Sequence, residues 1–307
     1  MEYFLAVDGG GTKTHVLCAD PSGTVLGEGM SGPTSLAATS VGAASFNLLE
    51  AVRQATQTLP EPKQCKALVM GLAGLDTDAE ALQANTVFKQ SLAHLNIQNW
   101  SLVNDSLIAL ESGTSNPDAV VLISGTGSNC FGRNSQGQTA KAGGMDYLLT
   151  DQGSGYAIGR AVLRESVKSF DGRGRKTELE QYVCEHFHIA SIAELKNKVS
   201  NPALTKTEVA ELAQQCLRAL DQGDAVAAAI FDHVVSDLST MINAVLKRLS
   251  LLDKPVDVVL AGSITKISVV KEKLVSACLI LNPQIKMVFP TKAPVHGALD
   301  LVLRQRS

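Results

Sequence analysis

Three glycine-rich turns carrying a hydroxyl residue are the strongest candidates for chemistry in this 307-residue chain. They are Gly9-Gly10-Gly11-Thr12, Gly125-Thr126-Gly127-Ser128 and Gly262-Ser263, and each follows a run of apolar residues. Glycine has no Cβ, so a ligand can approach the backbone closely, and successive amides in such turns bind anions. Each turn alone could simply join two strands. Together the three turns predict a site for phosphate groups.

Two acids stand where strands are expected to end. Asp8 directly precedes the first glycine turn, and Asp105 follows the apolar run of WSLVND. Phosphoryl transfer needs a clamp on the phosphates, a metal ion, and a carboxylate near the attacking hydroxyl. Asp8 is suited to hold Mg²⁺ through water, or alternatively accepts amide hydrogen bonds within the turn. Asp105 begins a helix, and an acid in that position most often caps it.

The elements that must position these residues alternate between strands and helices. Three strands are expected at 3–8, 13–20 and 24–29, and their close spacing predicts antiparallel neighbours. Further strands are expected in the segments 66–74, 100–105, 119–124, 129–133, 137–142, 255–263 and 285–290. Helices are expected at 40–58, 78–93 and 105–114, throughout 153–251 with a long one at 224–251, from about 266, and at 293–306.

The pattern of strand, glycine turn, strand, turn and strand occurs twice, about 115 residues apart. Such a repeat predicts two related domains. The chain length also favours two domains, because one compact core rarely takes 300 residues. We therefore expect two α/β domains that meet at a cleft.

Composition excludes several classes of protein. The net charge is −3 and aromatic residues make up 4%, so no nucleic-acid face is indicated. The first residues lack a basic region, and their apolar run is too short for a leader or a membrane span. Six cysteines lie far apart, without the spacing of zinc or iron–sulfur sites. These features predict a soluble cytoplasmic protein with reduced thiols.

Four segments carry a resemblance to a known family. AVDGGGTKT, VVLISGTGSN, VVLAGSI and APVHGALDL closely resemble, in this order, the first phosphate, second phosphate, adenosine and second connecting segments of the actin–hexokinase superfamily. Within it, the whole chain resembles the N-acetylglucosamine kinase group of the BadF/BadG/BcrA/BcrD ATPase family. The resemblance implies two ribonuclease H-like domains of the actin/hexokinase type, with mixed sheets around a nucleotide cleft. They would span residues 1–116 with 290–307, and residues 117–289.

The resemblance also implies a role for each candidate residue. ATP would contact Gly10, Gly11, Thr12, Lys13, Thr126, Gly127, Gly262 and Ser263. The sugar would contact Ser35, Asp105, Ser128, Asn129, Gly143, Gly144, Met145 and Asp151. Asp105 would accept the proton of the sugar 6-hydroxyl, and Asp8 would hold Mg²⁺. For Asp151, capping of the helix at QGSGYAIG is the alternative.

The implied activity is ATP-dependent phosphorylation of the 6-hydroxyl of an amino sugar, with N-acetylglucosamine as the first choice and a homodimer as the expected assembly. Ser35 and Met145 stand where relatives usually carry asparagine and often tryptophan, so glucosamine and N-acetylmuramic acid remain alternatives. A different alternative is an activator ATPase of a CoA-ester dehydratase or reductase, which would need cysteine thiolates for an iron–sulfur cluster. A sugar sensor without activity is disfavoured, because the phosphate turns and both acids are present.

Overall fold

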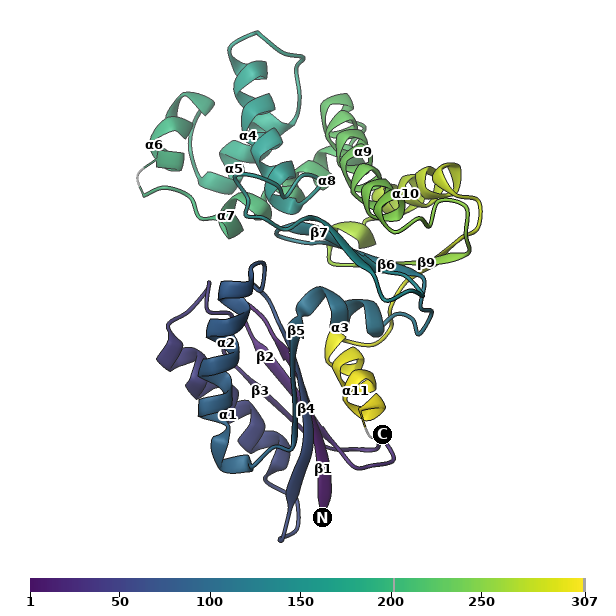
Figure 1. The fold of residues 1–307 in the computed structure, drawn as a ribbon. Coiled ribbons are helices and arrows are strands. Elements are labelled where there is room, and N and C mark those ends of the chain that lie inside the picture. The colour runs from purple at the N-terminus through teal and green to yellow at the C-terminus, as the bar shows by residue number, and fades with distance from the viewer. Residues whose placement is uncertain (201, 306–307) are drawn as a thin grey trace. The chain divides into compact units, whose positions relative to one another are not determined.

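The computed structural model describes residues 1–200 and 202–305, and it forms two compact units (Figure 1). Unit 1 comprises residues 1–121 with the C-terminal segment from 288, and unit 2 comprises residues 122–287. Each unit is built around one five-stranded sheet. The expected α/β class, with two mixed sheets, is confirmed.

The sheet of unit 1 has the strand order β3-β2-β1-β4-β5. Its first three strands run antiparallel, as their close spacing predicts, whereas β4 and β5 continue parallel to β1. Parallel pairing needs long connections: two strands and a helix lie between β1 and β4, and helical segments lie between β4 and β5. The strands are β1 (Glu2–Gly9), β2 (Thr14–Ala19), β3 (Val25–Ser31), β4 (Gln64–Leu72) and β5 (Asn99–Asn104).

Helices cover both faces of this sheet (Figure 1). Side chains alternate along β1: Tyr3, Leu5 and Val7 pack on the side of α1 and α2, and Phe4 and Ala6 on the side of α3 and α11. Because both faces of the strand are buried, residues 3–7 are all apolar. The helices are α1 (Val41–Thr56), α2 (Asp78–Ser91), the 3₁₀ turn η1 (Ala93–Leu95), α3 (Asp105–Glu111) and α11 (Pro294–Arg304).

The second sheet repeats the topology of the first. Its order, β10-β9-β6-β7-β8, again places the first strand in the centre, the next two on one side and the last two on the other. The repeat of glycine turns in the sequence thus corresponds to a repeat of sheet order. The strands are β6 (Ala119–Ser124), β7 (Ser128–Arg133), β8 (Thr139–Gly143), β9 (Val256–Ala261) and β10 (Ile285–Val288).

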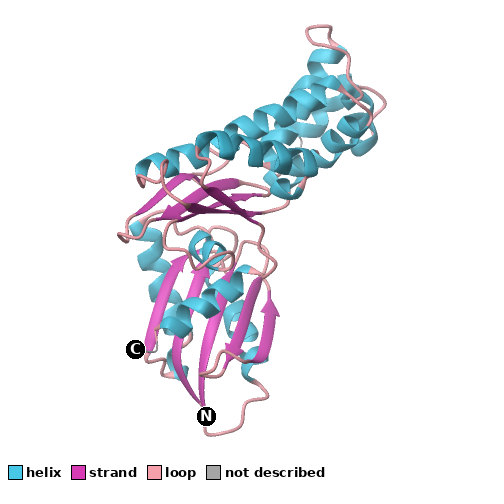
Figure 2. Cartoon of the chain, turned by 90° about the vertical axis from the view of Figure 1, so that its right-hand side faces the viewer, coloured by secondary structure: helices cyan, strands magenta, loops and turns pink. Residues whose placement is uncertain are grey.

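Helices of unit 2 gather on one side of its sheet, as the view in Figure 2 shows. The long helix α9 packs against β7 and β8 and against α4, α8 and α10. By length and composition α9 could cross a membrane, but half of its apolar window is buried inside the protein. The helical elements are α4 (Gly155–Phe170), α5 (Leu179–Phe187), η2 (Ile192–Glu194), α6 (Leu195–Ser200), α7 (Lys206–Glu211), α8 (Ala213–Asp221), α9 (Ala225–Arg248), η3 (Ile264–Lys266) and α10 (Ser268–Leu281).

Candidate functional site

The first glycine turn is tied to the segment that contains Ser35. The amide of Gly10 donates to the carbonyl of Lys13, which closes the turn between β1 and β2. The carbonyl of Gly10 accepts from the amides of both Thr34 and Ser35, each at 3.1 Å. Gly11, Thr12 and Lys13 are exposed at the tip. The structure therefore brings the expected sugar residue Ser35 next to the expected phosphate turn.

Asp8 and Asp105 lie near each other in unit 1. The pKa of Asp8 is raised to about 6, first by its burial and then by the negative charge of Asp105, while Lys13 acts in the opposite direction. A cation beside such a carboxyl favours its ionised form and lowers its pKa. The two acids named from the sequence thus belong to one electrostatic environment.

Asn104, and not Asp105, caps helix α3. The side chain of Asn104 accepts from the amide of Ser106 at 3.0 Å, and Asp105 is the first residue of the helix. The alternative of Asp105 as the cap is therefore wrong, because the residue before it already satisfies the end of the helix. The hydroxyl of Ser106 contacts Asp105 Oδ1 at 3.4 Å.

The residues of unit 1 fit a magnesium ion that is shared with phosphate. Mg²⁺ in such sites keeps several waters and uses one or two carboxylates plus phosphate oxygens. The described residues contain no group of three or more His, Cys, Asp or Glu side chains that would enclose a metal. Asp8, with its raised pKa and its place beside the glycine turn, would supply one carboxylate for an ion held in this way.

The second glycine turn is braced by the start of α4. The carbonyl of Gly125 accepts from the amide of Gly155 at 2.7 Å, and that of Thr126 accepts from Tyr156 at 3.2 Å. Within the turn, the amide of Gly125 donates to the carbonyl of Gly127. Because these carbonyls are used, the polar groups on the remaining side of the turn are mainly donors, as anion binding requires.

Asp151 is buried behind this turn. Its Oδ1 accepts from the amide of Ser128 at 3.0 Å, and its Oδ2 is 2.6 Å from Nζ of Lys206. The alternative of Asp151 as a helix cap is wrong, because Ser154 caps α4 by accepting from the amide of Ala157. Asp151 instead joins the turn to Lys206, a residue that no sequence motif marks.

The other expected sugar residues surround the junction of β7 and β8. Asn129 is paired with Gly143 across the two strands. Gly143 and Gly144 both have positive φ, of 77° and 72°, which explains the two consecutive glycines. Met145 follows and is 63% exposed, and its amide donates to Oγ1 of Thr150.

A cavity of about 340 Å³ in unit 2 joins the second and third glycine turns. Gly125, Thr126 and Ser263 all line it. Gly262 allows this approach, because a methyl group at that position would stand 2.1 Å from the carbonyl oxygen of Ser124. The expected phosphate turn and the expected adenosine turn thus open into the same space.

Sequence reasoning missed the wall of this cavity. That wall comes mostly from α7 and α8, about 80 residues after the glycine turn, and no motif marks it. Its lining residues are Thr207, Ala210, Glu211, Ala213, Gln214, Leu217, Ile264 and Ile267. The TKTE capping box that begins α7 predicts only a helix start.

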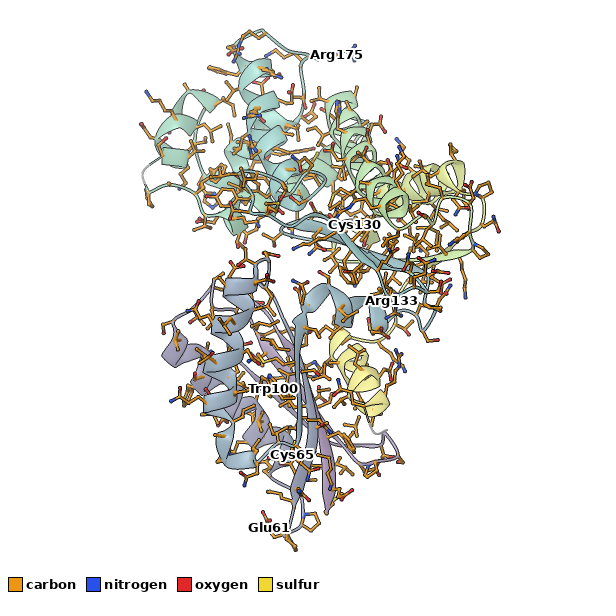
Figure 3. All side chains as sticks on the ribbon, in the orientation of Figure 1. Glu61, Cys65, Trp100, Cys130, Arg133 and Arg175 are labelled. Carbon is orange, nitrogen blue, oxygen red and sulfur yellow. The ribbon has the colours of Figure 1, made fainter. Side chains whose placement is uncertain are left out.

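Cysteine placement does not favour an iron–sulfur cluster. All six cysteines are free, and five of them are buried. Cys130 lies on β7 in the packed interior of unit 2, and burial strongly raises the pKa of its thiol (Figure 3). A cluster ligand must be a thiolate, so this environment suits a core residue.

Comparison with known proteins agrees with these features. The model of the BadF/BadG/BcrA/BcrD ATPase family matches residues 5–301. An N-acetylmuramic acid/N-acetylglucosamine kinase of Clostridium acetobutylicum is 30% identical over 302 residues, which cover 97% of each chain. An N-acetyl-D-glucosamine kinase of Dictyostelium discoideum is 28% identical over 99% of each chain. A solved structure from Chromobacterium violaceum, provisionally described as an N-acetylglucosamine kinase, is similar with a TM-score of 0.78, 24% identity and 98% coverage of both chains.

Proposed function

The chain belongs to the BadF/BadG/BcrA/BcrD ATPase family, and we propose that it phosphorylates an amino sugar with ATP. It is an ATP-dependent sugar kinase, in keeping with its kinase relatives. N-acetylglucosamine is the proposed acceptor, with transfer to its 6-hydroxyl. Both relatives named above carry N-acetylglucosamine in their names.

Each unit supplies part of the machinery in this proposal. Unit 1 contributes Asp8 for Mg²⁺, Asp105 as the base, and the turn Gly10, Gly11, Thr12 and Lys13 for the phosphates. Unit 2 contributes Thr126 and Gly127 for the phosphates and Gly262 and Ser263 for adenosine. The cavity beside these residues would hold the adenine ring. Bound Mg²⁺ would neutralise charge on the phosphates.

The observation that carries the proposal is the division of roles between Asn104 and Asp105. Asn104 caps α3, so capping is not the role of Asp105, which is the first residue of the helix. A general base must reach the hydroxyl proton that it accepts. Asp105 at the first position of α3, close to the charge of Asp8, is the group in unit 1 that best fits this role.

Acceptor recognition is assigned to Ser35 and Asp105 of unit 1 and to a set of unit 2 residues around β7 and β8. The latter are Ser128, Asn129, Gly143, Gly144, Met145 and Asp151. Glucosamine and N-acetylmuramic acid are the alternative acceptors, because Ser35 and Met145 depart from the usual residues of the family. An activator ATPase is disfavoured by the buried Cys130. We also propose that the protein is a cytoplasmic homodimer. The free thiols support a reducing compartment such as the cytoplasm, and they do not bear on the assembly.

A coupled assay of ADP release tests the function directly. N-acetylglucosamine should raise the rate well above a control without sugar, and above equal concentrations of glucosamine, N-acetylmuramic acid and glucose. A faster rate with another amino sugar would reassign the acceptor. If no sugar raised ADP release, the kinase proposal would be wrong.

A further inference from the structure

The ion pair of Lys206 and Asp151 lies directly against the second glycine turn. A methyl group placed at Gly127 would stand 3.0 Å from Lys206 Nζ and 2.9 Å from Asp151 Oδ2. The Asp151 side chain is 5% exposed, whereas that of Lys206 is 34% exposed. The acid is therefore fixed inside the protein, and the cation has access to solvent at the turn.

Lys206 also contacts the segment after Gly144. Its Nζ lies 5.8 Å from the ring centre of Tyr147, a cation–π distance. Tyr147 in turn packs edge to face on Tyr156, whose amide donates to Thr126. The ammonium group thus lies among the phosphate turn, the buried acid and the expected sugar segment, all within unit 2.

We propose that Lys206 binds the phosphate tail of the nucleotide, and that Asp151 holds it beside Gly127 until the nucleotide arrives. This inference rests on the proposed function, because it assumes that Thr126 and Gly127 receive phosphate. Lysine carries a compact charge on a flexible stem, so rotation of the stem can transfer Nζ from the carboxylate to a phosphate oxygen. Thr207, the next residue, lines the adjoining cavity.

The transfer has a consequence for the sugar. Once Lys206 leaves, Oδ2 of Asp151 is a buried carboxylate oxygen without its cation, which is costly until a new donor pairs with it. A hydroxyl of the acceptor sugar is such a donor. Nucleotide binding therefore strengthens sugar binding through this one lysine, and the coupling must be reciprocal.

Calorimetric titration with adenosine and with ADP tests the first step. Lys206→Gln should weaken ADP binding about tenfold or more and leave adenosine binding unchanged, because only ADP carries phosphates. Lys206→Arg should retain most of the ADP affinity, and Lys247→Gln, at an exposed lysine near the end of α9, should match the wild type. Equal ADP affinity in Lys206→Gln and wild type would overturn the proposal, as would an equal loss of adenosine and ADP.

Titration with N-acetylglucosamine, with and without saturating ADP, tests the coupling. In the wild type ADP should tighten sugar binding about fivefold or more, and in Lys206→Gln it should have no effect. If ADP tightened sugar binding equally in both proteins, the exchange at Asp151 would be wrong. A wild-type protein that bound neither adenosine nor ADP would instead refute the proposed function, and this inference with it.

A double variant distinguishes a loss of ADP binding from a loss of folding. Lys206→Gln alone leaves the buried carboxylate of Asp151 unpaired, which can unfold the protein. Asp151→Asn with Lys206→Gln removes both charges, and the asparagine oxygen can still accept from the amide of Ser128. This variant should fold, bind adenosine normally and bind ADP about tenfold more weakly. Normal ADP affinity in it would contradict the role of Lys206.

Discussion

Asp105, at the start of α3, lies close enough to Asp8, at the end of β1, for its negative charge to raise the pKa of the Asp8 carboxyl. Two acids in one environment have their ionisation coupled, and a cation between or beside them relieves the repulsion. The relationship is consistent with the proposed roles, in which Asp8 binds the metal ion and Asp105 accepts the proton.

Asp105→Asn should lower turnover about 100-fold or more while the fold and nucleotide affinity remain, because asparagine cannot accept the proton. Steady-state kinetics with saturating ATP and sugar measure the effect. Asp78→Asn is the matched control, since Asp78 is likewise the first residue of its helix, after the cap Thr77. It should keep wild-type turnover. Near-normal turnover of Asp105→Asn would remove this residue from the mechanism.

Asp8→Asn should make the magnesium-free protein more stable at pH 7.5, by about 1–3 kcal/mol. The folded state keeps the Asp8 proton up to about pH 6, and the unfolded chain loses it near the ordinary value of 3.8. Between these values the folded state binds more protons, so wild-type stability falls as pH rises. Urea unfolding from pH 4 to 8 measures this slope, which the variant should lack.

Magnesium should stabilise the wild type and not the Asp8→Asn variant. Addition of Mg²⁺ with ADP should raise the melting temperature of the wild type more than ADP alone does, and should give no further increase in Asp8→Asn. The variant removes the carboxylate but keeps the side-chain volume. A magnesium effect of the same size in both proteins would show that Asp8 does not hold the metal.

Gly297→Ala should impair catalysis through α3. A methyl group at Gly297 in α11 would stand 2.0 Å from the carbonyl oxygen of Ile108, so α3 must shift, and Asp105 with it. We expect a loss of about 1–3 kcal/mol of stability and a lower kcat with unchanged adenosine binding. Gly42→Ala in α1, where a methyl group meets nothing within 4 Å, should cost neither stability nor activity. Equal behaviour of the two variants would contradict the packing argument.

Ala210→Phe should block the cavity of unit 2. The added ring would occupy space beside Gly125 and Thr126. Adenosine and ATP should therefore each bind at least about tenfold more weakly, which is the size of effect that overpacking produces. Calorimetry with adenosine gives the direct measure. The control is Ala193→Phe, the same substitution in another cavity of unit 2, and it should bind adenosine normally. Unchanged adenosine affinity in Ala210→Phe would show that the adenine ring binds outside this cavity.

Local patterns determined much of this protein in advance. Alternating burial, glycine turns and helical spacing depend on neighbouring residues, and they predicted the strands β1 to β3, the helix α1 and the α/β class correctly. The glycine turns were also named from the sequence, because a missing Cβ is a property of the residue itself.

Only the tertiary structure decided which distant residues act together. Asn104 competes with Asp105 for the cap, and the backbone geometry gave that role to Asn104. Lys206 reaches Asp151, and α7 and α8 line the cavity beside Thr126, although 55 to 90 residues separate these partners along the chain. Such contacts follow from packing of whole elements, and no spacing within the sequence encodes them.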